Sequence, residues 1–398
     1  MSIIKTKYVD ILFSACFLVG VAGTAIATVL QTWTDYSYFE NRALNSAPIL
    51  TWDTFWDGSY FTEWESALVD HAVGREEILR ITTLADLNVI HRPVVNQVVP
   101  TNGKLLYQFN YEIVDQEELM KQAMSQSVVQ AKLQAMVESY GGYMLYVAVP
   151  GQYTYFQDEM PSFLNSRAAY TRAEMDAITR AFNQMDVSFL DVGPIFNSMG
   201  HPEEFYSATD HHFTYAGAYQ TYLLIMNRLT EEFDSDLSVL TGDLINFETL
   251  PNRYVGSRLR MVFGLWPTLE HPQIANFSIQ VPFTRTDNGR KVDAEVFAMP
   301  NTENEDVLYD IYMGGDVGNT ILDTERPELP SMLIYGDSFT NALETLLWYS
   351  FDKTHSLDLR HYQEGSLAEY IQKYQPDIVL CVRDYGSLLS ADGNGDPF

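Results

Sequence analysis

Apolar and polar positions follow different periods in successive stretches of the chain. The first long stretch, Ile11–Leu30, is apolar and uncharged, and Lys5 and Lys7 precede it. A helix of that length is about 30 Å long, which matches the hydrocarbon core of a bilayer. Because basic residues lie before the stretch and acidic residues follow it, we expect residues 1–30 to form a cytoplasmic tail and single-pass membrane anchor, with the main domain extracytoplasmic.

A cleavable signal peptide is an alternative interpretation of the same stretch. Ala25-Ile26-Ala27 has the small-x-small pattern of a cleavage site. The apolar stretch is longer than the core of a typical signal peptide, which favours the uncleaved anchor. Under either interpretation the remaining chain leaves the cytoplasm.

Residues 31–110 are expected to form an extracytoplasmic lead-in. Apolar spacing predicts two amphipathic helices, Tyr60–Ala72 and Glu76–Val89. Two β-rich segments, Val94–Val99 and Lys104–Tyr107, bracket a turn that contains Asn and Gly. This pattern predicts a hairpin before the main fold.

Helices alternate with short apolar strands in residues 111–233 and again in residues 329–398. This alternation predicts an α/β fold in two parts, with a parallel sheet covered by helices on both faces. Residues 234–328 interrupt it with Asn, Pro, Gly, Thr and Asp, and we expect a β-rich insertion or lid there. The expected helices are Gln116–Glu138, Arg172–Met185, Ala216–Phe233, Asn341–Ser350 and Leu367–Tyr374, and the expected strands are Tyr143–Val149, Val187–Val192, Met332–Tyr335, Ser356–Leu359 and Ile378–Val382.

The chain is acidic, with 24 Lys and Arg against 53 Asp and Glu and a formal net charge of −29. No nucleic-acid partner is expected, because such a partner requires a basic surface. Solubility explains the acidity, and a preference for cationic or neutral substrates over polyanions is the alternative. The two cysteines are Cys16 and Cys381, and we expect no disulfide because the first lies in the apolar stretch.

A serine follows the expected strand Met332–Tyr335, in the sequence Gly336-Asp337-Ser338, and opens a helix. A serine at such a junction projects from the carboxyl end of a parallel sheet, where open α/β folds hold their sites. Its backbone amide could help to stabilise an oxyanion at the helix N-terminus. Because Gly, Asp and Ser are also common capping and turn residues, the motif alone leaves a purely structural role open.

The sequence Asp210-His211-His212 precedes the expected helix Ala216–Phe233. In an extended segment, residues two apart point to the same side, so Asp210 could orient His212 as a general base. Such a neighbour is expected to leave the imidazole pKa near 6.5 or to raise it. The alternative is that Asp210 or Thr214 only caps the helix while the histidines pack.

His201, Asp210, His211 and His212 are also conceivable metal ligands. Adjacent histidines point in different directions in most conformations, and neither an HExxH motif nor a cysteine pair supports a metal site. We therefore expect no metal and no other cofactor.

Asp352 and His355 have the Asp-x-x-His spacing familiar from serine esterases. The expected helix between Ser338 and His355 would hold them about 20 Å apart at about 1.5 Å per residue. This pair is therefore not expected to serve Ser338.

These motifs, in their order along the chain, resemble bacterial DHHW-motif proteins, which are SGNH-hydrolase-like relatives of the alginate O-acetyltransferases. The similar segments extend from the lead-in to the C-terminal part. They are Glu40-Asn41-Arg42, Asp70-His71-Ala72-Val73-Gly74-Arg75, Val149-Pro150, Thr209-Asp210-His211-His212-Phe213, Gly217-Ala218-Tyr219, Tyr312-Met313-Gly314-Gly315, Gly336-Asp337-Ser338-Phe339 and Pro376-Asp377-Ile378-Val379.

The resemblance implies an SGNH-hydrolase-like, flavodoxin-like sheet, with Asp210 as orienter, His212 as base and Ser338 as nucleophile. It also implies transfer or removal of an acyl group, most simply acetyl, on a cell-surface or secreted glycan. A membrane-bound acyltransferase that supplies the acyl group is the implied partner. The alternative is a catalytically inactive SGNH-like surface module that binds glycan or a partner protein.

Further residues are considered for the site from their positions. Phe213 stands where the family usually has Trp, and Gln152 stands where a basic residue is expected after Val149-Pro150, so the substrate contacts stay open. The possible oxyanion or support residues are Gly336, Asp337, Asn341, Arg383 and His211.

Overall fold

The computed structural model describes residues 2–234, 236–389 and 397–398. The remaining positions lie outside the described residues; they belong to the expected cytoplasmic tail (residue 1), the insertion (residue 235) and the final part of the main domain (390–396). The chain forms two compact units, of which the first comprises Met1–Asn96 with Leu259–Trp266 and the second comprises Gln97–Arg258 with Pro267–Phe398.

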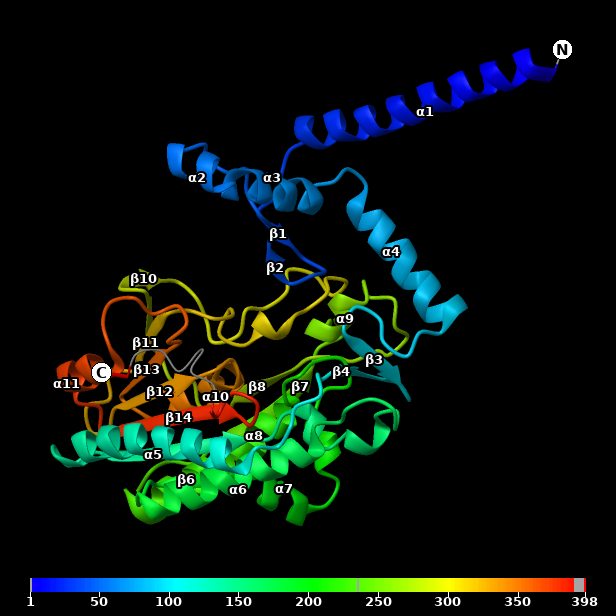
Figure 1. The fold of residues 1–398 in the computed structure, drawn as a ribbon. Helices are drawn as coiled ribbons and strands as arrows, with labels where there is room; N and C mark the ends of the chain where they lie inside the picture. The colour runs from blue at the N-terminus through cyan, green and yellow to red at the C-terminus, as the bar shows by residue number, and fades with distance from the viewer. Residues whose placement is uncertain (1, 235, 390–396) are drawn as a thin grey trace. The chain divides into compact units, whose positions relative to one another are not determined.

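The first unit begins with the long helix α1 (Ser2–Leu30) (Figure 1). Its stretch Tyr8–Leu30 has a mean hydropathy of 2.1 and is long and apolar enough to cross a membrane. Only 6% of its most apolar window is buried, so this helix contributes little to a protein core. The apolar helix expected from the sequence is confirmed.

Short elements follow α1 in the first unit. The predicted amphipathic helices are confirmed as α3 and α4, the second of which continues into a π-helical turn. Helix α2 was not predicted, because six residues are too few to show a periodic pattern. The elements are β1 (Tyr36–Ser37), β2 (Arg42–Ala43), α2 (Trp52–Asp57), α3 (Ser59–Asp70), α4 (Arg75–Ala85) and the π-helical turn Asp86–Ile90.

Within the described residues, the second unit is built on an eight-stranded sheet with the strand order β10-β9-β11-β13-β12-β14-β5-β6. The strands from β13 to β6 in this order are parallel, which confirms the predicted α/β fold. Their carboxyl ends therefore meet at one edge of the sheet. These strands are β5 (Tyr143–Val149), β6 (Phe189–Asp191), β12 (Met332–Gly336), β13 (Lys353–Leu357) and β14 (Ile378–Asp384).

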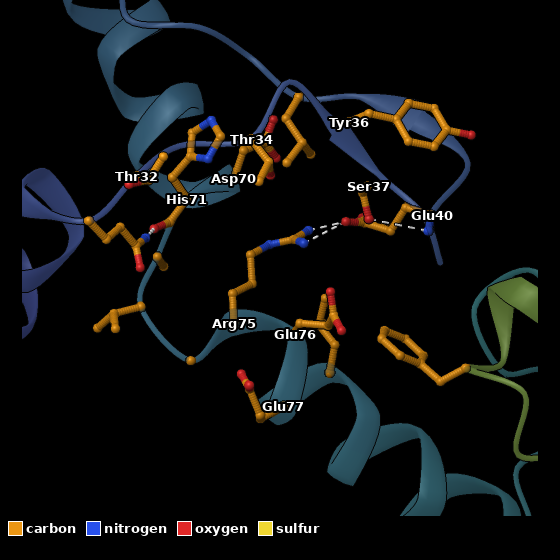
Figure 2. Close-up of a pocket in the computed structure, with 17 residues that line it drawn as sticks. Thr32, Thr34, Tyr36, Ser37, Glu40, Asp70, His71, Arg75, Glu76 and Glu77 are labelled. Atoms are coloured by element: carbon orange, nitrogen blue, oxygen red, sulfur yellow. Dashed lines mark hydrogen bonds and ion pairs between the residues drawn. The ribbon is translucent and has the colours of Figure 1, made fainter.

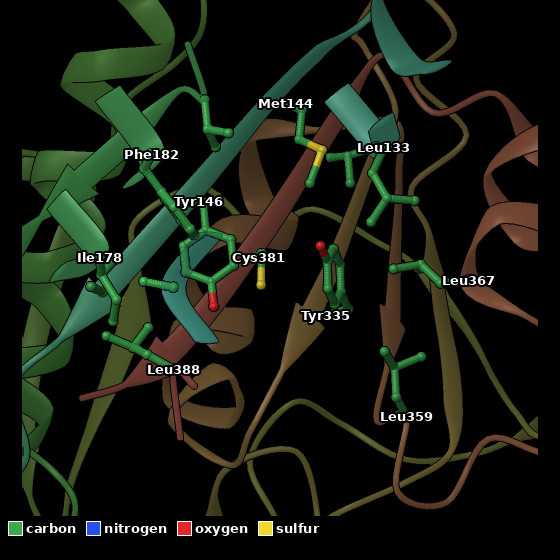
Figure 3. Close-up of a cluster of buried hydrophobic side chains, with 14 of the residues drawn as sticks. Leu133, Met144, Tyr146, Ile178, Phe182, Tyr335, Leu359, Leu367, Cys381 and Leu388 are labelled. Atoms are coloured by element: carbon green, nitrogen blue, oxygen red, sulfur yellow. The ribbon is translucent and has the colours of Figure 1, made fainter. Parts of the chain in front are cut away.

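Helices cover both faces of the parallel strands, as predicted (Figure 1). On one face, Tyr146, Cys381 and Tyr335 stand in register on neighbouring strands and pack against helix residues such as Leu133 and Phe182 (Figure 3). Cys381 is a free thiol. The helices on this face are α5 (Gln116–Glu138), α6 (Ala168–Gln184) and α11 (Leu367–Tyr374), and those on the other face include α7 (Val192–Met199), α8 (Tyr215–Glu232) and α10 (Phe339–Leu347).

The predicted insertion is β-rich, but much of it extends the main sheet. β11 pairs with the otherwise open edge of β13, and β9 and β10 continue outward in antiparallel fashion. Covering an open strand edge satisfies its backbone hydrogen-bonding groups. The strands of the insertion are β7 (Ile245–Thr249) and β8 (Gln273–Phe277), which form a separate ribbon, and β9 (Thr284–Asp287), β10 (Arg290–Val292) and β11 (Asn319–Asp323); a short helix α9 (Ser257–Met261) lies between β7 and β8.

Several element boundaries differ from the predicted ones. The predicted hairpin is confirmed as β3 (Val98–Thr101) and β4 (Lys104–Tyr107), although its first strand begins later than expected. Strand β6 is shorter than the predicted Val187–Val192. It begins two residues later, and at its carboxyl end Asp191 caps α7, its carboxylate accepting the Gly193 N–H at 3.0 Å. This cap explains why the strand ends one residue earlier than predicted.

Candidate active site

Ser338 lies at the junction between β12 and α10, half-buried at the carboxyl end of the sheet. Gly336 ends β12 at a very close approach to the neighbouring strand. A Cβ at this position would lie 1.8 Å from the Val382 carbonyl oxygen of β14. Only glycine fits there, so Gly336 fixes where the serine leaves the sheet.

Asp337 stabilises the turn that presents the serine. One carboxylate oxygen accepts the Phe339 N–H at 3.0 Å. The other accepts the Asp384 N–H at 2.8 Å and the Ser387 hydroxyl at 2.7 Å. Asp337 therefore ties the start of α10 to the last residue of β14 and to the turn that follows it.

Asp210, His211 and His212 lie in a tight bend, so the predicted extended alternation is wrong. Asp210 Oδ1 accepts the backbone N–H groups of His211 and His212 at 2.6 and 3.3 Å. The Ser207 hydroxyl accepts the Asp210 N–H at 2.9 Å. Asp and Ser favour such local bonds, and the bend brings the carboxylate and the imidazole together.

Ser338, His212 and Asp210 form one hydrogen-bonded chain. His212 Nε2 lies 2.7 Å from Ser338 Oγ, and His212 Nδ1 lies 2.9 Å from Asp210 Oδ1. Asp210 and His212 are buried, whereas the serine is half-buried. The structure therefore brings together the three residues predicted to be catalytic, in the order that a nucleophile, a general base and its orienting carboxylate require.

Two further groups hold Asp210 in place. Its Oδ2 accepts the Ser257 N–H at 2.7 Å and the Tyr254 hydroxyl at 3.2 Å. Between them, a Cβ on Gly256 would lie 2.3 Å from the Thr209 carbonyl oxygen. These residues belong to the insertion, and sequence reasoning missed them because no motif or periodicity marks them.

The buried triad has strongly shifted pKa values. Burial acts to raise the pKa of Asp210, but the neighbouring His211 and His212 and their hydrogen bonds outweigh it and hold that pKa well below its usual range. Burial, assisted by repulsion from His211, lowers the pKa of His212 to about 4 although Asp210 opposes this. The expectation of a pKa near or above 6.5 is therefore wrong, because desolvation of the imidazolium outweighs the carboxylate.

Tyr309 covers the imidazole of His212. The two rings are parallel to within 2° and their centroids lie 3.6 Å apart. The Phe339 ring lies 5.0 Å from the same imidazole. Tyr309 comes from a 3₁₀ turn (Tyr309–Ile311) in the insertion. The insertion thus contributes to the burial that lowers the pKa of His212.

His211 contacts the same carboxylate as His212, with its Nδ1 3.0 Å from Asp210 Oδ1. Atoms of Asp210, His211 and His212 lie within 4.8 Å of one another, so the three could hold a metal ion. Both ring nitrogens of His212 already bond to Asp210 and Ser338, and a metal would have to replace one of these bonds. His201, the fourth ligand considered from the sequence, is exposed and bonds elsewhere.

Two of the predicted support residues, Asn341 and Arg383, lie on α10 and β14, and His355, which was not expected to serve Ser338, lies on β13. Asn341 lies in the first turn of α10 and donates from its side-chain amide to Asp316 at 3.0 Å. Arg383 is buried near the end of β14. His355 lies on β13, where its Nδ1 is 2.7 Å from the Tyr370 hydroxyl. The oxyanion or support role expected for Asn341 and Arg383 therefore stays a prediction.

The two departures from the family pattern are both buried. Phe213 packs edge-on against Phe339, with ring centroids 4.9 Å apart. The Gln152 amide donates to the Ser207 carbonyl oxygen at 2.7 Å, just before the bend that carries Asp210. Phe213 therefore supports Phe339, which packs against the His212 ring, and Gln152 supports the segment that carries Asp210.

Residues 106–294 match the family described as the SGNH hydrolase-like domain of the acetyltransferase AlgX. This segment includes Asp210 and His212 and ends before Ser338. No curated protein matches the sequence.

Solved structures with a similar fold include PatB1 and a DHHW family protein. Bacillus cereus PatB1 with a sulfonyl adduct is 18% identical with a TM-score of 0.62, and the alignment covers 75% of this chain and 97% of that one. A DHHW family protein from Eubacterium siraeum is 16% identical with a TM-score of 0.57, and the alignment covers 76% and 95%. Together with the family match, these structures confirm the resemblance and the SGNH-like fold.

Proposed function

We infer from the SGNH hydrolase-like domain of this chain that the protein is a membrane-anchored, extracytoplasmic serine O-acyltransferase or esterase. Its proposed substrates are O-acyl groups, acetyl above all, of a cell-surface or secreted glycan. The observation that carries the proposal is the hydrogen-bonded chain from Asp210 through His212 to Ser338 at the carboxyl end of β12.

The geometry supports a two-step mechanism. In the first step Ser338 Oγ attacks the acyl carbonyl carbon while His212 Nε2 takes the hydroxyl proton, and Asp210 stabilises the imidazolium. Collapse of the tetrahedral intermediate breaks the ester bond, and His212 returns the proton to the leaving alcohol. In the second step a glycan hydroxyl or water loses its proton to His212 and attacks the acyl carbon. The bond between Ser338 Oγ and the acyl group then breaks, and His212 returns the proton to Ser338 Oγ, which regenerates the free enzyme.

The proposal also specifies the acyl group, acetyl, and the acceptor, a glycan. The matching family is described as an acetyltransferase, which favours acetyl over longer acyl groups. The glycan acceptor follows from the resemblance to enzymes that modify polysaccharides. We further propose that α1 anchors the chain and that a membrane-bound acyltransferase supplies the acyl group.

The test is acetyl transfer by the purified full chain, supplied with an activated acetyl ester and a polysaccharide. We expect ester consumption, with acetyl on the polysaccharide for a transferase and free acetate for an esterase. Ser338→Ala should reduce turnover by about 10³-fold or more, because it removes the nucleophile. Ser139→Ala, at an exposed hydroxyl, is the matched control. Equal turnover by Ser338→Ala, or well-folded wild type that consumes no acyl ester, would contradict the proposal.

A further inference from the structure

Helix α4 exposes an aliphatic stripe on the face opposite the one that it buries. Ile78, Ile81 and Leu84 are 62%, 67% and 48% exposed. Thr83, which is buried, and Leu79, which is half-buried, lie on the other side of the same helix. A helix on the surface of a soluble domain turns polar residues to water. This stripe therefore indicates a second apolar environment on the outer side of α4.

The turn that precedes α4 is bonded to the end of the apolar helix α1. The Thr28 hydroxyl accepts the Val73 N–H at 3.1 Å, and the Gln31 amide donates to the His71 carbonyl oxygen. The Trp33 ring stacks on the His71 ring with centroids 4.3 Å apart. If α1 crosses a membrane, these bonds place the start of α4 at the same depth as the last turn of α1.

Ion pairs fix the first residue of α4 and the last residue of α3 to the β1–β2 hairpin. Arg75 Nη2 donates to Glu40 at 2.9 Å, and its Nη1 bonds to the other oxygen of the same carboxylate, beside a cavity of about 570 Å³ (Figure 2). Arg42 likewise pairs with Asp70 through both carboxylate oxygens. The start of α4 is thus held by several bonds rather than by a loose linker.

We propose that α4 is an interfacial helix whose stripe of Ile78, Ile81 and Leu84 contacts the outer leaflet of the bilayer that α1 crosses. The proposal rests on the anchored topology proposed above. Acidic residues outnumber basic ones between residues 31 and 96, so attraction to anionic lipids does not drive this contact. Burial of the aliphatic stripe drives the contact instead, so we expect α4 to bind a surface of zwitterionic phospholipids.

Spin-label accessibility in phosphatidylcholine vesicles tests the proposal on the full chain. Cys16 is replaced by Ser and Cys381 is fully buried, so one label can be attached at Ile81→Cys. Arg80→Cys, an exposed position in the same turn on the flank of the stripe, is the matched control. We expect the label at position 81 to be relaxed more by oxygen than by a water-soluble nickel chelate, and the label at position 80 to show the reverse.

Two other outcomes would overturn the proposal. Equal preference for the nickel chelate at both positions would mean that the stripe faces water. Protection of position 81 from both reagents would mean that protein, either a partner or a second copy, covers it.

The anchor and the enzyme are assayed separately on matched samples. A label on the natural Cys16 reports whether α1 lies in the bilayer, and acetyl-ester turnover reports the proposed activity. Lipid exposure at Cys16 with water exposure at position 81 would refute the interfacial helix alone. Absence of acetyl-ester turnover together with lipid exposure at position 81 would refute only the proposed enzymatic activity.

Discussion

The environment of His212 sets the pH range in which the proposed triad is active. Its imidazole is enclosed by Tyr309 and Phe339 and donates to or accepts from Asp210 and Ser338. Burial lowers its pKa to about 4. A general base must be neutral to take a proton, so this histidine is ready to act well below neutral pH.

The pH dependence of kcat/KM follows from this pKa. Because neutral His212 is the active form, kcat/KM for an acetyl ester should be lost as the pH falls through about 4 and should be flat around neutrality. His211→Ala should move the midpoint upward, since the His211 charge contributes to the lowered pKa. A single rise centred at or above pH 6.5 in the wild type would show that the imidazole is not desolvated in the free enzyme.

Gly256 permits the close packing of the insertion against the Asp210 bend. A Cβ there would lie 2.3 Å from the Thr209 carbonyl oxygen and 2.8 Å from Asp210 Cβ. Gly256→Ala should displace the bend and lower kcat by about 10-fold to 100-fold. The matched control is Gly23→Ala, where a Cβ would meet nothing within 4 Å. Unchanged kcat in folded Gly256→Ala would mean that the bend tolerates the shift.

At the scale of elements, the insertion is part of the site. It supplies Tyr254 and Ser257 to the Asp210 carboxylate and Tyr309 to the His212 ring. Its strands β9, β10 and β11 also continue the main sheet. The insertion therefore stabilises the base and its carboxylate through contacts that no local motif encodes.

The stacked ring of Tyr309 provides a test of this role. Tyr309→Ala should admit water to the imidazole and raise the midpoint of the kcat/KM profile by about one pH unit or more toward 6.5. Tyr309→Phe keeps the ring and should leave the midpoint unchanged. If the Ala and Phe variants have the same midpoint, the insertion does not control desolvation of His212.

Much of the fold could be predicted because its signals are local. The apolar strands β5, β12 and β14 and the helix α5 follow from runs and periods in the sequence, and Gly336-Asp337-Ser338 marks a strand-to-helix junction. The pairing of Asp210 with His212 was also expected, although the bend that produces it was not. Tyr254, Ser257 and Tyr309 were missed because their contacts join positions far apart in the chain. The extension of the sheet by β9, β10 and β11 was missed because it depends on an open strand edge, which only the folded structure reveals.

At the scale of the whole molecule, the proposed topology rests on the uncharged stretch Ile11–Leu30 of α1 and on Lys5 and Lys7, which lie before that stretch. A tag after Phe398 should be removed by protease added to intact cells, whereas a tag before Met1 should be protected until the membrane is permeabilised. Protection of the C-terminal tag on intact cells would place the domain in the cytoplasm and exclude an extracytoplasmic glycan as its substrate.

Covalent labelling of Ser338 tests the central claim most directly. A fluorophosphonate probe reacts with a serine only when a neighbouring base has activated it, and peptide mass spectrometry locates the adduct. We predict one adduct per chain on Ser338, lost in Ser338→Ala and slowed by about 10²-fold or more in His212→Ala. Folded wild-type protein that stays unlabelled, or that is labelled equally fast after loss of His212, would contradict an activated serine and favour a binding module built on the same fold.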